Sequence, residues 1–318
     1  MSTPPIVEAR RLSKTYVGAD RPAVDGVDLS IARGRIFGLL GPNGAGKTTF
    51  MSMLCGLLPP SAGEIRLNGE DVQRASAALR RRIGLVPQDL ALYPGLSARE
   101  NLCYFGGIQG LCGRVLDERI DYCLEIAGLG ALSDRRVGTF SGGLKRRLNL
   151  VIGLIHQPEL LILDEPTVGI DPQSRHFIHD NLRRLNAAGL SIIYTSHYME
   201  EVERLCDELA IIDHGHIIAH GTVDELLNRL PNNRILLRVA RPLSADWQSR
   251  LKTLEGVERI DFEGRAVTIE SHLPQPTLAR VLATLQQGDI AVLSVSLGAV
   301  NLEQVFLSLT GTRLRDAP

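Results

Sequence analysis

The feature that most constrains the fold of this chain is a glycine-rich segment near its start. The segment consists of Gly41, Pro42, Asn43, Gly44, Ala45, Gly46, Lys47 and Thr48. It fits the pattern GxxxxGK[ST], follows the apolar run Ile36–Leu40, and precedes a predicted helix from Lys47 to about Leu58. Glycines let successive backbone N–H groups point at phosphate oxygens, and the helix start adds the positive end of its dipole. We therefore expect a phosphate-binding loop, with Lys47 on the β- and γ-phosphates and the Thr48 hydroxyl on Mg²⁺.

Strands and helices alternate through the first two-thirds of the chain. Besides Ile36–Leu40, the strands that we expect are Val7–Arg10, Asp28–Ile31, Ile83–Val86, Leu160–Leu163 and Ser191–Thr195. Continuous apolar strands are typical of sheets that are covered on both faces, so this part is predicted to be α/β with a mostly parallel sheet. A helix-rich interval from about Ser97 to His156 separates the strands.

The predicted strand Leu160–Leu163 ends in two adjacent carboxylates, Asp164 and Glu165. Ligands of parallel sheets bind at the carboxyl ends of the strands. We expect Asp164 to hold Mg²⁺ and Glu165 to polarise an attacking water, because phosphoryl transfer depends on positioning and electrostatics. Two carboxylates that only cap a strand are common, but beside a phosphate loop the functional interpretation is favoured.

A third motif, Phe140–Arg147, precedes a predicted helix that runs to His156. Ser141 is suited to cap this helix, and Gly142 and Gly143 leave backbone N–H groups open. The alternative is a simple capped helix without a ligand. The functional interpretation is a second helix start that can bind an anion.

The order and spacing of these motifs resemble the ATP-binding subunit of an ABC transporter, over about residues 5–225. The resemblance implies a P-loop NTPase fold, the ABC ATPase domain, with a mixed sheet and a helical subdomain at about 90–158. In that family the SGG motif at Ser141 is usually followed by glutamine. Leu144 stands there in this chain, and with the KRR that follows it resembles the branch of drug-resistance and nodulation-type exporters.

The resemblance assigns roles to further residues. It implies that Tyr16 stacks on adenine, that Gln88 senses Mg²⁺ and the γ-phosphate, and that His197 is the switch histidine at the γ-phosphate. Asp171 matches the D-loop of the family. The nucleotide-binding residues that we expect are Tyr16, Gly41, Pro42, Asn43, Gly44, Ala45, Gly46, Lys47, Thr48, Thr49, Ser141, Gly142, Gly143 and Asp171. The expected catalytic residues are Gln88, Glu165 and His197, and the expected Mg²⁺ ligands are Thr48, Gln88 and Asp164.

The resemblance also implies a head-to-tail dimer, in which ATP lies between the phosphate loop of one copy and Ser141 of the other. Two anion-binding helix starts in one chain agree with this, since one triphosphate could engage both only across an interface. Both half-sites are intact, which favours a homodimer. ATP binding would close the dimer and hydrolysis would open it, with the helical interval 97–140 moving about Gln88.

Membrane and nucleic-acid partners are constrained by composition. No apolar stretch reaches the ~18 residues of a membrane span, so a transporter built on this chain needs a separate multi-span permease. By family analogy, the segment around Leu92-Tyr93-Pro94 and the helix from Ser97 would face it. We expect a peripheral protein on the cytoplasmic face of the inner membrane. The 35 basic and 36 acidic residues give a net charge of −1, which predicts no nucleic-acid partner.

Two alternatives compete with a transport ATPase. A non-transport ABC ATPase in translation or DNA repair usually carries two cassettes, long coiled coils or zinc modules, and none is evident here. The five cysteines include no CxxC pair, which argues against a zinc site. A P-loop kinase would leave the SGG motif and His197 unexplained.

We place the ABC ATP-binding domain at residues 1–225. The alternation of strands and helices changes near Pro231-Asn232-Asn233. The elements that we expect beyond it are a strand (Arg234–Val239), a helix (Asp246–Leu254), two strands (Val257–Phe262 and Arg265–Glu270), a helix (Thr277–Gln286), a strand (Ala291–Leu297) and a last helix (about Leu302–Leu309). This βαββαβ order predicts a small α+β accessory domain of the ferredoxin-like type at 232–318. Its ending, from Asn301 to Gly311, resembles the same exporter branch. Dimerisation, regulation and permease contact are all open as its role.

Overall fold

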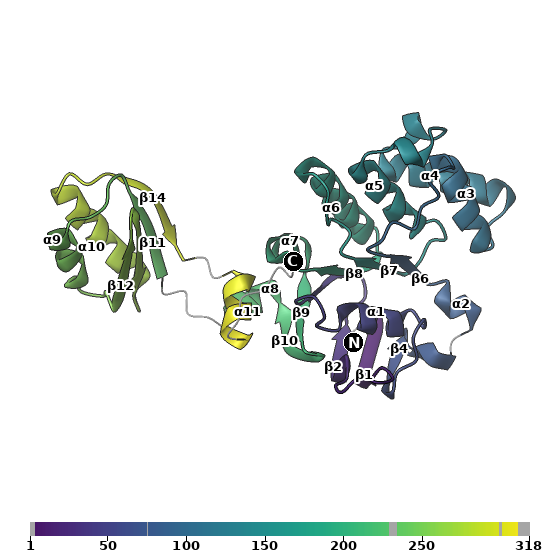
Figure 1. Cartoon of the computed structure of the whole chain (residues 1–318), viewed down its shortest axis with the longest axis horizontal. Helices are drawn as coiled ribbons and strands as arrows, with labels where there is room; N and C mark the ends of the chain where they lie inside the picture. The colour runs from purple at the N-terminus through teal and green to yellow at the C-terminus, as the bar shows by residue number, and fades with distance from the viewer. Residues whose placement is uncertain (1–3, 75, 229–233, 299–300, 311–318) are drawn as a thin grey trace. The chain divides into compact units, whose positions relative to one another are not determined.

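The computed structural model describes residues 4–74, 76–228, 234–298 and 301–310. It divides the chain into two compact units (Figure 1). The first comprises the chain up to Val223 together with the chain from Phe306, and the second comprises Asp224–Val305. The sequence placed the second domain at 232–318, so the observed unit begins earlier and ends earlier. The boundary predicted at 231–233 lies outside the described residues.

The first unit is built on a six-stranded sheet in the order β10-β9-β3-β8-β7-β6 (Figure 1). Its strands are β3 (Ile36–Leu40), β6 (Ile83–Val86), β7 (Leu160–Asp164), β8 (Ser191–Ser196), β9 (Glu208–Asp213) and β10 (His216–Thr222). All neighbours pair in parallel except β9 and β10. Every residue of β3, β7 and β8 is buried, as expected for strands covered on both faces. The predicted α/β fold with a mostly parallel sheet is confirmed.

A second, antiparallel sheet has the order β2-β1-β4-β5. Its strands are β1 (Val7–Lys14), β2 (Val24–Ile31), β4 (Ala62–Leu67) and β5 (Glu70–Asp71). The sequence predicted parts of β1 and β2 as strands but did not separate them into a sheet of their own. Buried and exposed residues alternate along β2, and this pattern is typical of a sheet with one solvated face.

The helices of the first unit complete the mixed α/β arrangement. They are α1 (Lys47–Leu54), α2 (Ala77–Arg80), α3 (Ala98–Ile108), α4 (Gly113–Ala127), α5 (Gly142–Ile152), α6 (Pro172–Ala187) and α7 (Met199–Leu205), with short 3-10 helices at Val72–Arg74, Gly130–Leu132 and Val137–Thr139. Helix α1 ends at Leu54 rather than near Leu58, and Gly56 two residues on has φ 68°. Helices α3, α4 and α5 pack against one another (Figure 1) and lie in the interval, about 90–158, where a helical subdomain is expected.

The second unit contains a four-stranded antiparallel sheet in the order β12-β13-β11-β14. Its elements are β11 (Arg234–Val239), α9 (Ala245–Lys252), β12 (Arg259–Glu263), β13 (Ala266–Glu270), α10 (Pro274–Gln287) and β14 (Val292–Leu297). Alternate residues of β11 are buried in a core shared with Leu251, Val281 and Leu285 of the two helices. Two helices, α8 (Val223–Leu227) and α11 (Leu302–Thr310), lie where the chain passes between units. None of the described helices is both long enough and apolar enough to cross a membrane.

Candidate functional site

The phosphate loop connects the buried strand β3 to helix α1, and its glycines are required by space and by backbone angle. Gly46 has φ 110°, and a Cβ atom there would lie 2.3 Å from the carbonyl oxygen of Ala23. A Cβ at Gly41 would lie 2.3 Å from the carbonyl oxygen of Ile212. Only glycine fits such positions, so the loop backbone is fixed by its neighbours before any ligand binds.

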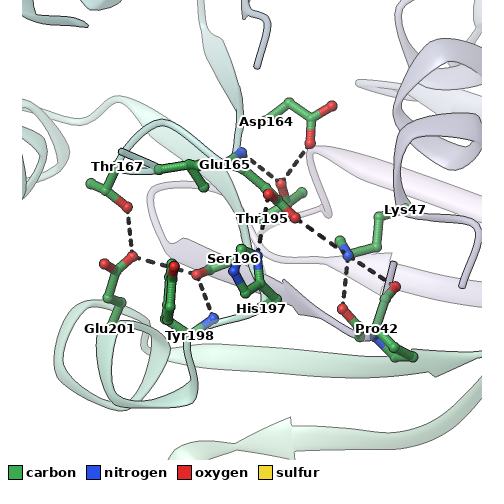
Figure 2. Close-up of polar contacts among 12 residues, drawn as sticks. Pro42, Lys47, Asp164, Glu165, Thr167, Thr195, Ser196, His197, Tyr198 and Glu201 are labelled. Atoms are coloured by element: carbon green, nitrogen blue, oxygen red, sulfur yellow. Dashed lines mark hydrogen bonds and ion pairs between the residues drawn. The ribbon is translucent and has the colours of Figure 1, made fainter. Parts of the chain in front are cut away.

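Lys47 lies beneath this loop with its side chain almost fully buried (Figure 2). Its Nζ donates hydrogen bonds to the carbonyl oxygens of Gly41 (2.7 Å) and Pro42 (3.1 Å). The same atom lies 3.6 Å from Oε1 of Glu165. Burial lowers the pKa of Lys47, and the nearby carboxylates of Glu165 and Asp164 oppose that shift. The ammonium is thus held rigidly at the base of the loop.

Asp164 at the end of β7 accepts two hydroxyl hydrogen bonds. Thr48 Oγ1 donates to Oδ2 (3.2 Å), and Thr195 Oγ1 donates to Oδ1 (2.9 Å). Burial raises the pKa of Asp164, and the two hydroxyls work against that rise. The Thr48 hydroxyl and the Asp164 carboxylate together form a set of hard oxygen donors, the kind of ligand that Mg²⁺ prefers.

Glu165 adopts a left-handed backbone conformation, with φ 45°. Its backbone N–H donates to Thr195 Oγ1 (3.0 Å), which holds the residue in this uncommon conformation. Its carboxylate is buried between the side chains of Lys47 and His197. Oε1 lies 3.6 Å from Lys47 Nζ, and Oε2 lies 3.2 Å from His197 Nδ1 (Figure 2). A carboxylate so placed is positioned for proton transfer.

A cavity of about 150 Å³ opens beside these groups. Its lining residues are Ala23, Asn43, Gly44, Gly46, Lys47, Thr48, Thr49, Gln88 and Glu165. Three further predicted residues connect to this lining: Asp164 through Thr48, His197 through Glu165, and Tyr16, whose hydroxyl lies 3.2 Å from Thr49 Oγ1. Two of the remaining loop residues, Gly41 and Pro42, hold Lys47 through their carbonyls, and Ala45 is buried.

The other predicted residues lie together in a second place, outside that cavity lining. Ser141 caps α5, and its Oγ accepts the N–H of Leu144 at 3.4 Å. Asp171 caps α6 by accepting the N–H (2.8 Å) and the hydroxyl (2.7 Å) of Ser174, and these bonds lower the pKa of Asp171. A Cβ at Gly143 would lie 2.1 Å from Ser174 Oγ, so α5 and α6 meet closely there. Ser141 and Gly142 are exposed.

Sequence reasoning missed three residues that support the site. Thr195 joins Asp164 to Glu165, as described above. Arg146 on α5 donates hydrogen bonds to the carbonyl oxygens of Gln88 and of Val168, the latter at 3.3 Å. A polar side chain within the apolar strand β8 was a usable signal for Thr195. The partners of Arg146 are far away in sequence and gave no signal.

The third missed residue is Glu201, a buried carboxylate on α7 (Figure 2). Its Oε2 accepts hydrogen bonds from Thr167 Oγ1 (2.7 Å), Tyr194 Oη (2.7 Å) and Ser196 Oγ (3.4 Å). Thr167 follows Glu165 by two residues, and Ser196 directly precedes His197. Glu201 therefore joins the two segments that carry the Glu165–His197 pair.

Comparisons with known proteins agree on one family. The family model described as "ABC transporter" matches residues 24–168. The linearmycin resistance ATP-binding protein of Bacillus subtilis (strain 168) is 41% identical over 98% of this chain and 100% of its own length. A Nod factor export ATP-binding protein of Ralstonia nicotianae is 40% identical over 98% of this chain and 96% of its own length. A solved ATP-binding subunit of an ABC transporter superposes with a TM-score of 0.64, at 28% identity, over 70% of this chain and 92% of that one.

Proposed function

Since this chain belongs to the ABC transporter family of ATP-binding subunits, and is an ATPase, we propose that it powers export through a separate membrane permease. The observation that carries the proposal is the Glu165 carboxylate, which is buried between Lys47 and His197 at the wall of the cavity. The predicted residue assignments follow from this arrangement.

Nucleotide binding is assigned to the loop and its surroundings. The backbone N–H groups of the loop from Gly41 to Thr49, except at Pro42, which has none, and the ammonium of Lys47 bind the phosphates, and Tyr16 stacks on the adenine. The half-exposed ring of Tyr16, with its hydroxyl beside Thr49, supports that assignment. Thr48, Asp164 and Gln88 would hold Mg²⁺, and the ion would supply positive charge beside the phosphates.

Hydrolysis is assigned to three residues. Glu165 accepts a proton from the attacking water, and His197 contacts the γ-phosphate that is cleaved. Gln88 lines the same cavity and connects it to the helical subdomain, because its carbonyl is bound by Arg146 of α5. Lys47 stabilises the negative charge that develops on the phosphate oxygens.

A second copy of the chain completes the site. Ser141, Gly142 and Gly143 form a helix start that lies outside the lining of the phosphate cavity of the same chain, and Ser141 and Gly142 are exposed. One ATP engages both only if a second copy supplies its Ser141 in a head-to-tail dimer. Asp171 lies beside Gly143, at 3.3 Å from the position of its Cβ, and so belongs to the same contact surface. We expect a homodimer, because each chain contains both halves.

Export is proposed from the relatives, whose names state resistance to linearmycin and export of Nod factor. The permease-facing surface is assigned to the segment around Tyr93 and to α3. Tyr93 and Tyr104 are exposed there, with their hydroxyls 3.1 Å apart, and Phe105 packs against both rings. Such a cluster of exposed aromatic side chains suits a protein contact. The chain would then lie at the cytoplasmic face of the inner membrane, bound to its permease.

The catalytic proposal is tested by Glu165→Gln, with the exposed Glu200→Gln as its matched control. Removing a general base lowers the rate by about 100-fold or more. We expect steady-state ATP hydrolysis by Glu165→Gln to fall by that factor while ATP still binds, and Glu200→Gln to match the wild type. Hydrolysis by Glu165→Gln at the wild-type rate would show that Glu165 is not the base.

The permease proposal is tested by Tyr93→Glu, which puts a charge into the aromatic cluster. We expect unchanged ATP hydrolysis by the isolated chain, together with loss of the membrane subunit in co-purification and loss of transport. Unchanged complex formation and unchanged transport would contradict the assignment of this surface.

A further inference from the structure

Strand β14 forms one edge of the sheet in the second unit, and it pairs regularly with β11 from Ser294 to Leu297, with one irregularity between Ser294 and Val292. Its six residues, Val292–Leu297, include no charged residue and no proline. Three apolar side chains are largely exposed: Leu293 (59%), Val295 (43%) and Leu297 (37%). Edge strands with exposed apolar side chains and open backbone groups pair with other strands unless charge, proline or a bulge prevents it.

The opposite edge of the same sheet is protected. Strand β12 carries Arg259, Asp261 and Glu263 along its five residues, and Arg259 Nε lies 3.2 Å from Asp261 Oδ2. Antiparallel self-pairing about Asp261 would place one carboxylate against its copy. The sheet thus carries charge on one edge and none on the other, which singles out β14 for pairing.

The direction of the free backbone groups of β14 follows from its pairing with β11. Gly298 N–H donates to the carbonyl oxygen of Arg234, so these two residues form a hydrogen-bonded pair. Such pairs alternate along an antiparallel ladder. Ser296 and Ser294, opposite Leu236 and Arg238, therefore bond to β11. Val295 between them, and Leu297 beyond Ser296, turn their N–H and C=O groups toward the open edge, while Leu293 lies in the irregularity between Ser294 and Val292.

We propose that β14 pairs with β14 of a second copy of this chain, about a two-fold axis at Val295. The sequence Leu293-Ser294-Val295-Ser296-Leu297 is the same in both directions. About that axis Val295 faces its copy, and each Leu293 faces a Leu297. Val295 then exchanges both of its backbone hydrogen bonds with Val295 of the second copy, because the outward groups of the two residues face each other. Contacts of this isologous kind are the usual basis of homodimers.

This contact goes beyond the proposed function, because it uses neither the phosphate loop nor Ser141. It joins two four-stranded sheets into one continuous sheet and covers the apolar row Leu293, Val295 and Leu297. We therefore expect it to persist without ATP. It assigns dimerisation to the second unit, and it keeps two copies paired while the ATP-dependent contact opens.

The oligomeric state of the full chain without nucleotide tests the pairing, measured by sedimentation velocity over a wide range of concentration. We expect the wild type to be a dimer. Val295→Lys puts a charge at the two-fold axis, and the dimer should weaken at least about 100-fold. Leu236→Lys is the matched control, because Leu236 is equally exposed (42%) but lies on β11, which has a neighbour on both sides. It should remain a dimer.

The register is tested by two double variants at the same positions. Leu293→Lys with Leu297→Lys places like charges opposite each other and should give monomers. Leu293→Lys with Leu297→Glu places opposite charges together twice and should give dimers. The two variants make similar demands on folding, which circular dichroism verifies.

Four results would overturn the inference. The first is a wild type that stays monomeric without nucleotide at every concentration. The second is a Val295→Lys dimer as tight as that of the wild type, which would place the contact elsewhere. The third is equal behaviour of the two double variants, which would exclude this register. A Val295→Lys variant that loses thermal stability without any change of mass would show that β14 packs within its own chain, and it would refute the inference too.

Discussion

Replacing Thr195 by valine tests how the two carboxylates of the site are held. The change keeps the shape of the side chain and removes one hydroxyl. Thr195 is fully buried, and its Oγ1 accepts the N–H of Glu165 at 3.0 Å and donates to Asp164 at 2.9 Å. Valine leaves the N–H of Glu165 without this acceptor and Oδ1 of Asp164 without this donor. We expect a loss of both stability and activity.

The magnitude follows from the two bonds. A buried donor left without a partner costs about 1–3 kcal/mol, and a lost hydrogen bond to a charged group costs about 1.5–3 kcal/mol. The added methyl group returns about 0.8 kcal/mol through its burial. The expected net loss is about 2–5 kcal/mol, or roughly 4–20 °C in Tm for a unit of this size. Because Glu165 loses the bond that holds its strained backbone, kcat should fall by about 10- to 100-fold.

Thr195→Ser is the matched control, because it keeps the hydroxyl and removes only the methyl group. Scanning calorimetry gives Tm, and steady-state ATP hydrolysis gives kcat and KM. We expect Thr195→Ser to keep most of the activity and Thr195→Val to lose it with little change in the KM for ATP. Equal kcat values for the two variants would refute the view that this hydroxyl positions Glu165.

Three further substitutions follow from the same geometry. Gly46→Ala should weaken ATP binding by at least about tenfold in calorimetric titration, since its Cβ would lie 2.3 Å from a carbonyl oxygen. Arg146→Gln should lower kcat by about tenfold, because Gln88 loses the donor to its carbonyl. Arg119→Gln is the matched control for Arg146→Gln. It also removes hydrogen bonds to two backbone carbonyls, and it should leave kcat unchanged. Glu201→Gln should lower kcat but not ATP affinity, since its amide oxygen can replace only Oε2, which accepts the hydroxyls, and its NH2 group then meets Arg175 Nε, 3.1 Å from Oε1. An unchanged kcat in Arg146→Gln or Glu201→Gln, or unchanged ATP binding in Gly46→Ala, would contradict the corresponding role.

Local patterns predicted much of the first unit. The strand β3 has the bounds that its apolar run predicted, and Ser141 caps α5 as expected. Sequence analysis did not identify β4, β9 and β10. Strand β9 contains the buried apolar run Leu209-Ala210-Ile211-Ile212, so its pattern was sufficient and was overlooked. Strand β10 follows β9 after a tight turn in which His214 and Gly215 have positive φ, and β4 begins with exposed residues, so neither β10 nor β4 is a fully buried apolar run.

The residues of the site also fall into those that sequence analysis could predict and those that it could not. Residues within one motif, such as Gly46 and Lys47, are set by the loop itself and could be predicted. Residues that join motifs could not, because their contacts span large sequence separations: 30 residues between Glu165 and Thr195, 58 between Gln88 and Arg146, and 34 between Thr167 and Glu201. Such contacts depend on the packing of the whole unit and leave no local pattern.

The head-to-tail site is tested most directly by complementation between two inactive variants. Lys47→Ala disables the phosphate loop, and Ser141→Ala disables the opposite half of the site. When the two are co-expressed with different tags, each mixed dimer contains one intact site, formed by the loop of one copy and Ser141 of the other. We predict that the mixture hydrolyses ATP at about one quarter of the wild-type rate, because half of the dimers are mixed and each has one of two sites. Activity no higher than that of the separate variants would contradict a site shared between two copies.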